Sequence, residues 1–129
     1  MKGYLLDTNI VLNALGRPHL LSRRAKAAVR SGPNVVSVLV YWEVMLKTMK
    51  GLLLVGYPQA WWQDTLDILC ATSLPLKPEH VTGVDGLPFH HRDPFDRMLI
   101  AQAAVEDLTL VTSDREISKY KSNRIRVIV

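Results

Sequence analysis

The sequence predicts a single-domain α/β fold in which helices cover both faces of a parallel β-sheet. Short apolar segments alternate with segments of helical periodicity along the chain, an order typical of parallel sheets. The 129 residues are enough for one core, and they contain no repeat, linker or low-complexity tract. We therefore expect residues 1–129 to form one domain with a five-stranded sheet.

The first part of the chain predicts two strands and two helices. Residues 2–6 (KGYLL) form a buried strand, and the TNIVLNAL segment that follows forms a short helix. Between residues 19 and 30, apolar and basic side chains recur on different faces at helical spacing, which predicts an amphipathic helix. The SGP sequence after Arg30 ends this helix, and NVVS (34–37) is the second strand.

The middle of the chain predicts three helices and a third strand. Ser37 caps a helix that Gly51 ends. The inner stripe of this helix is expected to consist of Val38, Tyr41, Trp42, Met45 and Met49. After an irregular LLLVGYP segment, a helix begins near Pro58, SLPLK (73–77) is a strand, and PEHVTGV (78–84) is a short helix.

The last part of the chain predicts a long helix and two further strands. A loop of sequence GLPFHHR leads to the DP pair at 93–94, and this pair starts a helix that lasts to about Asp107. Residues 108–112 (LTLVT) form the fourth strand, 114–120 a short helix, and 125–129 the fifth strand.

Composition narrows the class of protein. Hydrophobic residues make up 48% and charged residues 22%, as in ordinary globular domains, and no apolar run approaches the roughly 18 residues of a membrane span. The N-terminal segment lacks the pattern of a secretory signal, and the single cysteine excludes an internal disulfide and a thiolate zinc site. We expect a soluble cytoplasmic protein without a membrane partner, in which Cys70 is a packing residue.

The net charge favours polyanionic partners. The formal charge is +4 and the pI is about 9.4, so nucleic acid is the first candidate. Four basic residues gather in one predicted helix: Arg23, Arg24, Lys26 and Arg30. They form either an RNA-facing patch or an ordinary solvated helix face.

Four acidic residues lie close to predicted strand exits or helix starts. Asp7 follows the first strand, Asp114 follows the fourth, Glu43 lies in the helix after the second, and Asp96 lies in the first turn of the long helix. Ligands of parallel sheets bind beyond the carboxyl ends of the strands, where the strand order reverses. If the first and fourth strands are neighbours, Asp7 and Asp114 line that crevice.

Such a group of carboxylates suits a divalent cation. Carboxylates forced together repel one another, and Mg²⁺ or Mn²⁺ offsets the repulsion. A bound ion lowers the pKa of water and offsets charge on a phosphoryl oxygen, which is the chemistry of phosphodiester hydrolysis. Structural explanations also exist: Asp7 and Asp114 suit helix caps, Asp96 gains from the helix dipole, and Glu43 suits a pair with Lys47.

The order of four segments carries a resemblance to a known family. LLDTNI, the Trp42-Glu43 pair, DPFDRMLIAQA and LTLVTSD follow one another, and the chain resembles a PIN-domain ribonuclease, more closely a VapC-type toxin. The resemblance implies a PIN-like three-layer sandwich with a five-stranded parallel sheet and Mg²⁺- or Mn²⁺-dependent RNA cleavage. It also implies a homodimer and a small cognate antitoxin whose tail occupies the active-site groove.

The same resemblance assigns site residues. The metal-binding and catalytic acids are then Asp7, Glu43, Asp96 and Asp114. Asn9 and Thr112 are polar neighbours that orient the acids. Asp93 belongs to the same motif, but we expect it to cap the helix rather than bind metal.

Several nearby residues have two interpretations each. Arg97 either pairs with Asp93 along the helix or contacts substrate phosphate or the acids. His90 and His91 lie in a solvated loop or reach RNA. Trp61 and Trp62, with the LLLV run, form a surface for antitoxin or dimer contacts, while at least one of them packs in the core.

Two alternative functions stay open, and two others agree poorly with the sequence. A PIN nuclease of RNA processing with no toxin role shares the site, and a catalytically silent PIN module would bind RNA or protein instead. A phosphatase with an N-terminal aspartate nucleophile needs a second Asp two positions after Asp7, where Asn9 stands. A receiver domain needs paired acids after its first strand and a Lys after its last.

Overall fold

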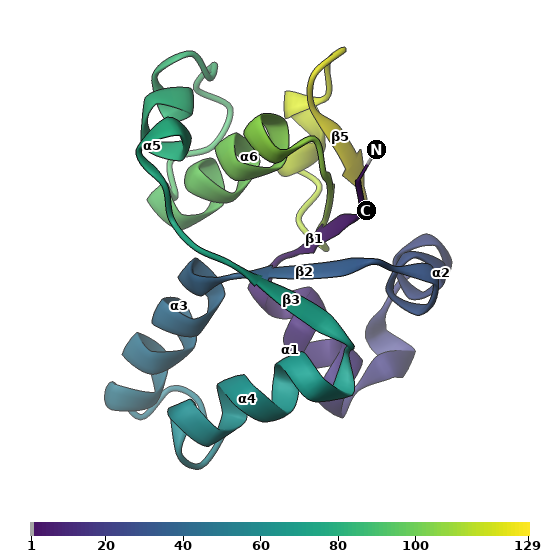
Figure 1. Cartoon of the computed structure of the whole chain (residues 1–129), viewed down its shortest axis with the longest axis vertical. Coiled ribbons are helices and arrows are strands. Elements are labelled where there is room, and N and C mark those ends of the chain that lie inside the picture. Colours follow the sequence, from purple (N-terminus) through teal and green to yellow (C-terminus); the bar gives the residue numbers. More distant parts are fainter. Residues whose placement is uncertain (1) are drawn as a thin grey trace.

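The computed structural model describes residues 2–129 and shows a five-stranded parallel sheet with helices on both faces (Figure 1). The strands are β1 (Tyr4–Leu6), β2 (Asn34–Ser37), β3 (Ala71–Leu74), β4 (Thr109–Val111) and β5 (Arg126–Ile128). The helices are α1 (Thr8–Gly16), α2 (Arg23–Ser31), α3 (Val38–Met49), α4 (Pro58–Ile68), α5 (Pro78–Asp85) and α6 (Pro94–Glu106), with 3₁₀ turns η1 (Pro18–Leu20) and η2 (Ile117–Tyr120). The predicted α/β class and strand number are confirmed, while the predicted domain start at residue 1 lies outside the described residues.

The strand order places β1 in the centre of the sheet. The order is β3-β2-β1-β4-β5, and β1 pairs with β4 in a register that sets Leu6 opposite Val111. The first and fourth strands are therefore neighbours, as the crevice requires. Because the strand order reverses between β1 and β4, the carboxyl ends of these two strands open onto the expected ligand position.

Two apolar layers hold the helices against the sheet. On one face, Leu5 and Leu110 pack under α6, and on the other face Leu6 and Val111 pack against α1 to α4. Neighbouring strand residues point to opposite faces, so both faces of the central strands are apolar. In the view of Figure 1, α5 and α6 lie above the sheet, and α1, α3 and α4 lie below it.

Several predicted elements are shifted or shortened. The helix predicted between residues 19 and 30 begins only at Arg23, because Ser22 caps it after the separate 3₁₀ turn η1. The third strand covers Ala71–Leu74 rather than 73–77, because Pro75 follows directly and has no N–H to continue the ladder. Of the helix predicted at 114–120, only the 3₁₀ turn η2 forms, while Asp114 makes a local turn before it.

Two predictions about burial are wrong. In α3 the buried residues are Leu39, Val40 and Val44, whereas Trp42 and Met49 are 55% and 75% exposed. This helix is apolar around most of its surface, so its spacing does not single out one face. Cys70 is exposed because it occupies the turn between α4 and β3 with a φ of 48°.

Among the helices within residues 2–129, none has the length and apolar character needed to cross a bilayer.

Candidate functional site

The four predicted acids lie near the carboxyl edge of the sheet. Asp7 follows β1, Asp114 follows β4, Glu43 lies in α3, and Asp96 lies in the first turn of α6. The charges of Glu43 and Asp114 act on Asp7, and those of Asp7 and Glu43 act on Asp96. Four segments that are distant in sequence thus place their acids close enough to act on one another electrostatically.

Asp7 is a buried carboxylate with fixed oxygens. It is 6% exposed and caps α1, with Oδ1 accepting a hydrogen bond from the Ile10 amide at 3.0 Å. Its Oδ2 accepts a short hydrogen bond from the Thr112 hydroxyl. Burial raises the pKa of Asp7 to about 6; the bonds from Thr112 and Ile10 oppose the shift, and the charges of Glu43 and Asp114 add to it.

Thr112 connects Asp7 to Asp114. Its Oγ1 donates to Asp7 and accepts from the backbone N–H of Asp114 at 3.1 Å. Asp114 Oδ1 in turn accepts from the Glu116 amide at 2.9 Å. The backbone therefore fixes one oxygen of Asp114, while Oδ2 lies 3.0 Å from His91 Nε2.

Asp96 is held at the start of α6 by a neighbouring cap. Asp93 Oδ1 accepts from the Phe95 amide at 2.8 Å and from the Asp96 amide at 3.5 Å, which confirms Asp93 as the N-cap. Burial raises the pKa of Asp96 to about 7, with further upward contributions from Asp93, Asp7 and Glu43 and an opposing one from His91.

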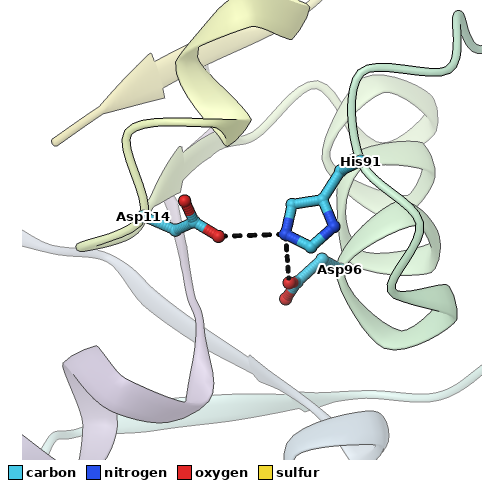
Figure 2. A group of neighbouring side chains, drawn as sticks. All are labelled: His91, Asp96 and Asp114. Atoms are coloured by element: carbon cyan, nitrogen blue, oxygen red, sulfur yellow. Dashed lines mark hydrogen bonds and ion pairs between the residues drawn. The ribbon is translucent and has the colours of Figure 1, made fainter.

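His91 joins the site although it is not among the residues that the sequence predicts for it. Figure 2 shows its ring between the two acids, with Nε2 3.1 Å from Asp96 Oδ2 and 3.0 Å from Asp114 Oδ2. His91, Asp96 and Asp114 each present an atom able to bind a metal, and these atoms lie within 4.8 Å of one another. The sequence feature that could have identified His91 as a site residue is its position two residues before Asp93.

Arg97 acts on the loop before α6 and not on the acids. Its side chain is buried, and Nη1 donates to the Pro88 carbonyl at 2.8 Å and to Tyr120 Oη at 3.1 Å. The guanidinium also lies 4.2 Å from the ring centre of Phe89. The predicted pair with Asp93 is therefore wrong, because the guanidinium of Arg97 contacts loop carbonyls and the side chains of Tyr120 and Phe89 instead.

The structure also locates three other residues for which the sequence predicts a role. Glu43 forms the predicted pair with Lys47 at 3.8 Å. Asn9 is exposed in the first turn of α1, and within residues 2–129 its side chain makes no hydrogen bond, so its orienting role stays a prediction. Trp62 is buried and stacks on Tyr41, which confirms one core tryptophan.

The donor set fits a hard divalent cation. All four acids offer carboxylate oxygens, and two of them, Asp7 and Asp96, have raised pKa values because they are buried beside other acids. A divalent cation at this edge would favour the charged form of both groups. Carboxylate-rich sites of this kind suit Mg²⁺ or Mn²⁺ better than softer metals.

Comparison with known proteins agrees with the geometry. The sequence matches the family model described as PIN domain over residues 4–123. No curated protein matches the sequence.

Solved structures share the fold at low identity. VapBC2 from Rickettsia felis, bound to a promoter DNA fragment, has a TM-score of 0.68 at 16% identity, covering 97% of this chain and 96% of that chain. FitAcB from Neisseria gonorrhoeae has a TM-score of 0.66 at 20% identity, with 98% and 96% covered. A toxin-antitoxin complex from Klebsiella pneumoniae has a TM-score of 0.63 at 22% identity, with 98% and 96% covered.

Proposed function

The chain belongs to the PIN-domain family, whose members act as nucleases, and on this premise we propose that it is a metal-dependent endoribonuclease. The observation that supports the proposal is the meeting of Asp7, Glu43, Asp96 and Asp114 at the point where the strand order reverses. These acids would hold Mg²⁺ or Mn²⁺, and the basic surface would neutralise RNA phosphates around them.

The residues of the chain contribute binding and orientation. When bound, the divalent ion supplies a water of lowered pKa and offsets charge on a phosphoryl oxygen. Thr112 fixes the relative positions of Asp7 and Asp114 through its one hydroxyl. Asp93 fixes the first turn of α6, and with it Asp96. The exposed Arg23, Arg24 and Arg30 of α2 remain candidates for RNA contact.

We further propose that the enzyme is the toxin of a type II toxin–antitoxin pair. Solved structures of similar fold include toxin–antitoxin complexes, and these cover nearly the whole chain. The protein exposes Leu54 (96%), which lines a cavity of about 510 Å³ together with Leu53 and Trp61, and it exposes Tyr57 (85%) further along the same segment. This apolar area suits a small cognate antitoxin, and the proposal includes a homodimer that acts on RNA in the cytoplasm.

Cleavage of labelled single-stranded RNA tests the catalytic part of the proposal. Wild-type protein should cut RNA with Mn²⁺ or Mg²⁺ and lose this activity in EDTA. Asp7→Asn and Asp96→Asn should be inactive while remaining folded, and Asp64→Asn, an exposed acid on α4, should cut like the wild type. Full activity of Asp96→Asn would remove that residue from the site, and single-stranded DNA of the same sequence tests the preference for RNA.

Growth measurements separate the toxin from its alternatives. Expression of the wild type should arrest growth, and co-expression of the adjacent small reading frame should relieve the arrest. An active nuclease that leaves growth unchanged would indicate a role in RNA processing. A protein that binds RNA but neither cuts it nor binds Mn²⁺ would indicate a silent PIN module.

A further inference from the structure

We propose that His91 is a clasp that occupies the metal-facing oxygens of Asp96 and Asp114, and that a divalent cation must displace its ring to bind. The proposal rests on the proposed function, since it concerns the same site. It assigns to His91 a regulatory role that limits metal affinity, rather than the role of a metal ligand.

The position of the ring proton follows from one backbone contact. The Asp93 amide N–H donates to His91 Nδ1 at 3.0 Å, so Nδ1 accepts and carries no proton. The ring proton is then on Nε2, the nitrogen that faces both acids. While Nε2 carries this proton, it donates hydrogen bonds to the carboxylates and has no lone pair with which to bind a metal. The ring therefore competes with a cation for Asp96 and Asp114.

The two acids do not depend on His91 for their positions. Asp114 is held by Thr112 through its amide and by the Glu116 amide through Oδ1, and both contacts leave Oδ2 free for the clasp. Asp96 is fixed by the first turn of α6, which Asp93 caps. Loss of the imidazole would leave both carboxylates in place without their shared donor. This gives the effect a definite sign, because removal of the clasp should strengthen cation binding.

The loop that carries the clasp is anchored without the ring. The backbone amides of His90 and His91 both donate to Tyr120 Oη, at 3.1 and 2.8 Å. Arg97 donates to the same hydroxyl and to the Pro88 carbonyl. When the His91 ring leaves the acids by rotation about its side-chain bonds, it gives up the contact from the Asp93 amide, while the His91 backbone stays bonded to Tyr120 Oη. Truncation of the ring should likewise cost only the Asp93 contact and leave the anchoring of the loop to Tyr120 in place.

Titration with Mn²⁺ at constant pH tests the clasp, with free Mn²⁺ measured by electron paramagnetic resonance. The apparent Kd of His91→Ala should be roughly tenfold lower than that of the wild type, the effect of losing one hydrogen bond to a charged group. His90→Ala is the matched control, because His90 is exposed and its ring packs in a T-shaped arrangement with the Tyr120 ring rather than against the acids. Its Kd should equal that of the wild type.

Imidazole ¹⁵N spectra of the wild type give an independent readout. Without metal, His91 should carry its proton on Nε2 alone, and addition of diamagnetic Mg²⁺ should abolish the protection of that proton from solvent exchange. An unchanged or raised Kd in His91→Ala, or a metal-bonded His91 nitrogen, would overturn the clasp while leaving the metal site of the proposed function standing. Failure of all three proteins to bind Mn²⁺ would overturn both.

Discussion

Asp7 serves two purposes whose energetic demands conflict. As the N-cap of α1 it is held by the Ile10 amide, and as a member of the acidic group it sits buried beside Glu43 and Asp114. A neutral cap such as Asn would satisfy the helix equally well. Burial raises its pKa to about 6, so at neutral pH the metal-free protein carries a charge that destabilises the fold. This cost is expected at a site that a cation completes.

Asp7→Asn should therefore stabilise the metal-free protein at pH 8. The folded-state pKa of about 6 exceeds the ordinary 3.8, so the folded chain binds more protons than the unfolded chain between these values. Its contribution to stability is full below pH 3.8 and is lost as the pH rises through 6. The gain should be on the order of 2 kcal/mol at pH 8 and near zero at pH 4. Urea unfolding in EDTA at both pH values measures it, and a less stable Asp7→Asn at pH 8 would contradict the assignment.

Metal binding should weaken in mild acid for the same reason. The pKa values of Asp7 and Asp96 are raised to about 6 and about 7, and a protonated carboxyl is a poor ligand. The apparent Kd for Mn²⁺ should therefore rise as the pH falls from 8 to 5.5, by roughly tenfold or more. Calorimetric titration at four pH values measures the trend. A constant Kd across this range would show that these two acids are not ligands.

Residue roles followed from the sequence only where local chemistry determines them. Asp93 before a proline is a cap in the sequence and in the structure. His91 reaches the acids because its loop is bonded to Tyr120, 29 residues further along the chain. No local sequence pattern predicts this contact between the loop and Tyr120. The predicted pair of Arg97 with Asp93 is wrong for the same reason, since the partners of Arg97 lie in the folded loop and not along its own helix.

At the scale of elements, the N-terminus of α6 links helix stability to the chemistry of the site. Asp93 caps the helix through its side chain, and its charge raises the pKa of Asp96 three residues later. The two effects are separable by substitution, because Asn keeps the capping oxygen and removes the charge.

Asp93→Ala and Asp93→Asn should differ in stability but agree in their effect on Asp96. Loss of the cap in Asp93→Ala should cost about 1 kcal/mol, while Asp93→Asn should stay within a few tenths of the wild type. Both should lower the pKa of Asp96, followed by ¹³C carboxyl NMR. Equal stability of the two variants would show that the cap is not the source of the effect, and an unchanged pKa would exclude the charge of Asp93 as a cause.

The loop before α6 depends on one buried cation. Arg97→Ala would leave the Pro88 carbonyl without this donor and remove one of the three donors to Tyr120 Oη, and it should cost about 2 to 4 kcal/mol. Hydrogen exchange at the His90 and His91 amides should accelerate, because both bond to Tyr120. Arg92→Ala, an exposed cation of the same loop, is the control and should leave exchange unchanged. Unchanged exchange in Arg97→Ala would mean that Tyr120 alone anchors the loop.

Element positions were predictable where the sequence marks both ends. The second strand is correct to the residue because SGP precedes it and Ser37 caps the next helix. The third strand is shifted because the turn after α4 ends at Cys70, whose φ is 48°, and Pro75 stops the ladder after Leu74. The exposed Trp42 was not predictable, since α3 offers apolar side chains on more than one face.

At the scale of the molecule, the strand order creates the site. The sequence predicts parallel strands from their alternation with helices, but it does not state which strands are neighbours. The pairing of β1 with β4 brings Asp7 and Asp114 together across more than a hundred residues, and Thr112 then joins them by hydrogen bonds. The acids of α3 and α6 complete the group from either side of the sheet.

The most direct test of the central claim is the anomalous diffraction of a crystal soaked in Mn²⁺. The strongest anomalous peak should lie at the carboxyl edge of β1 and β4, bonded to oxygens of Asp7, Asp96 and Asp114, with the His91 ring moved off the two latter acids. A peak on another surface, or none at this edge at saturating Mn²⁺, would contradict the claim that these acids form a divalent cation site.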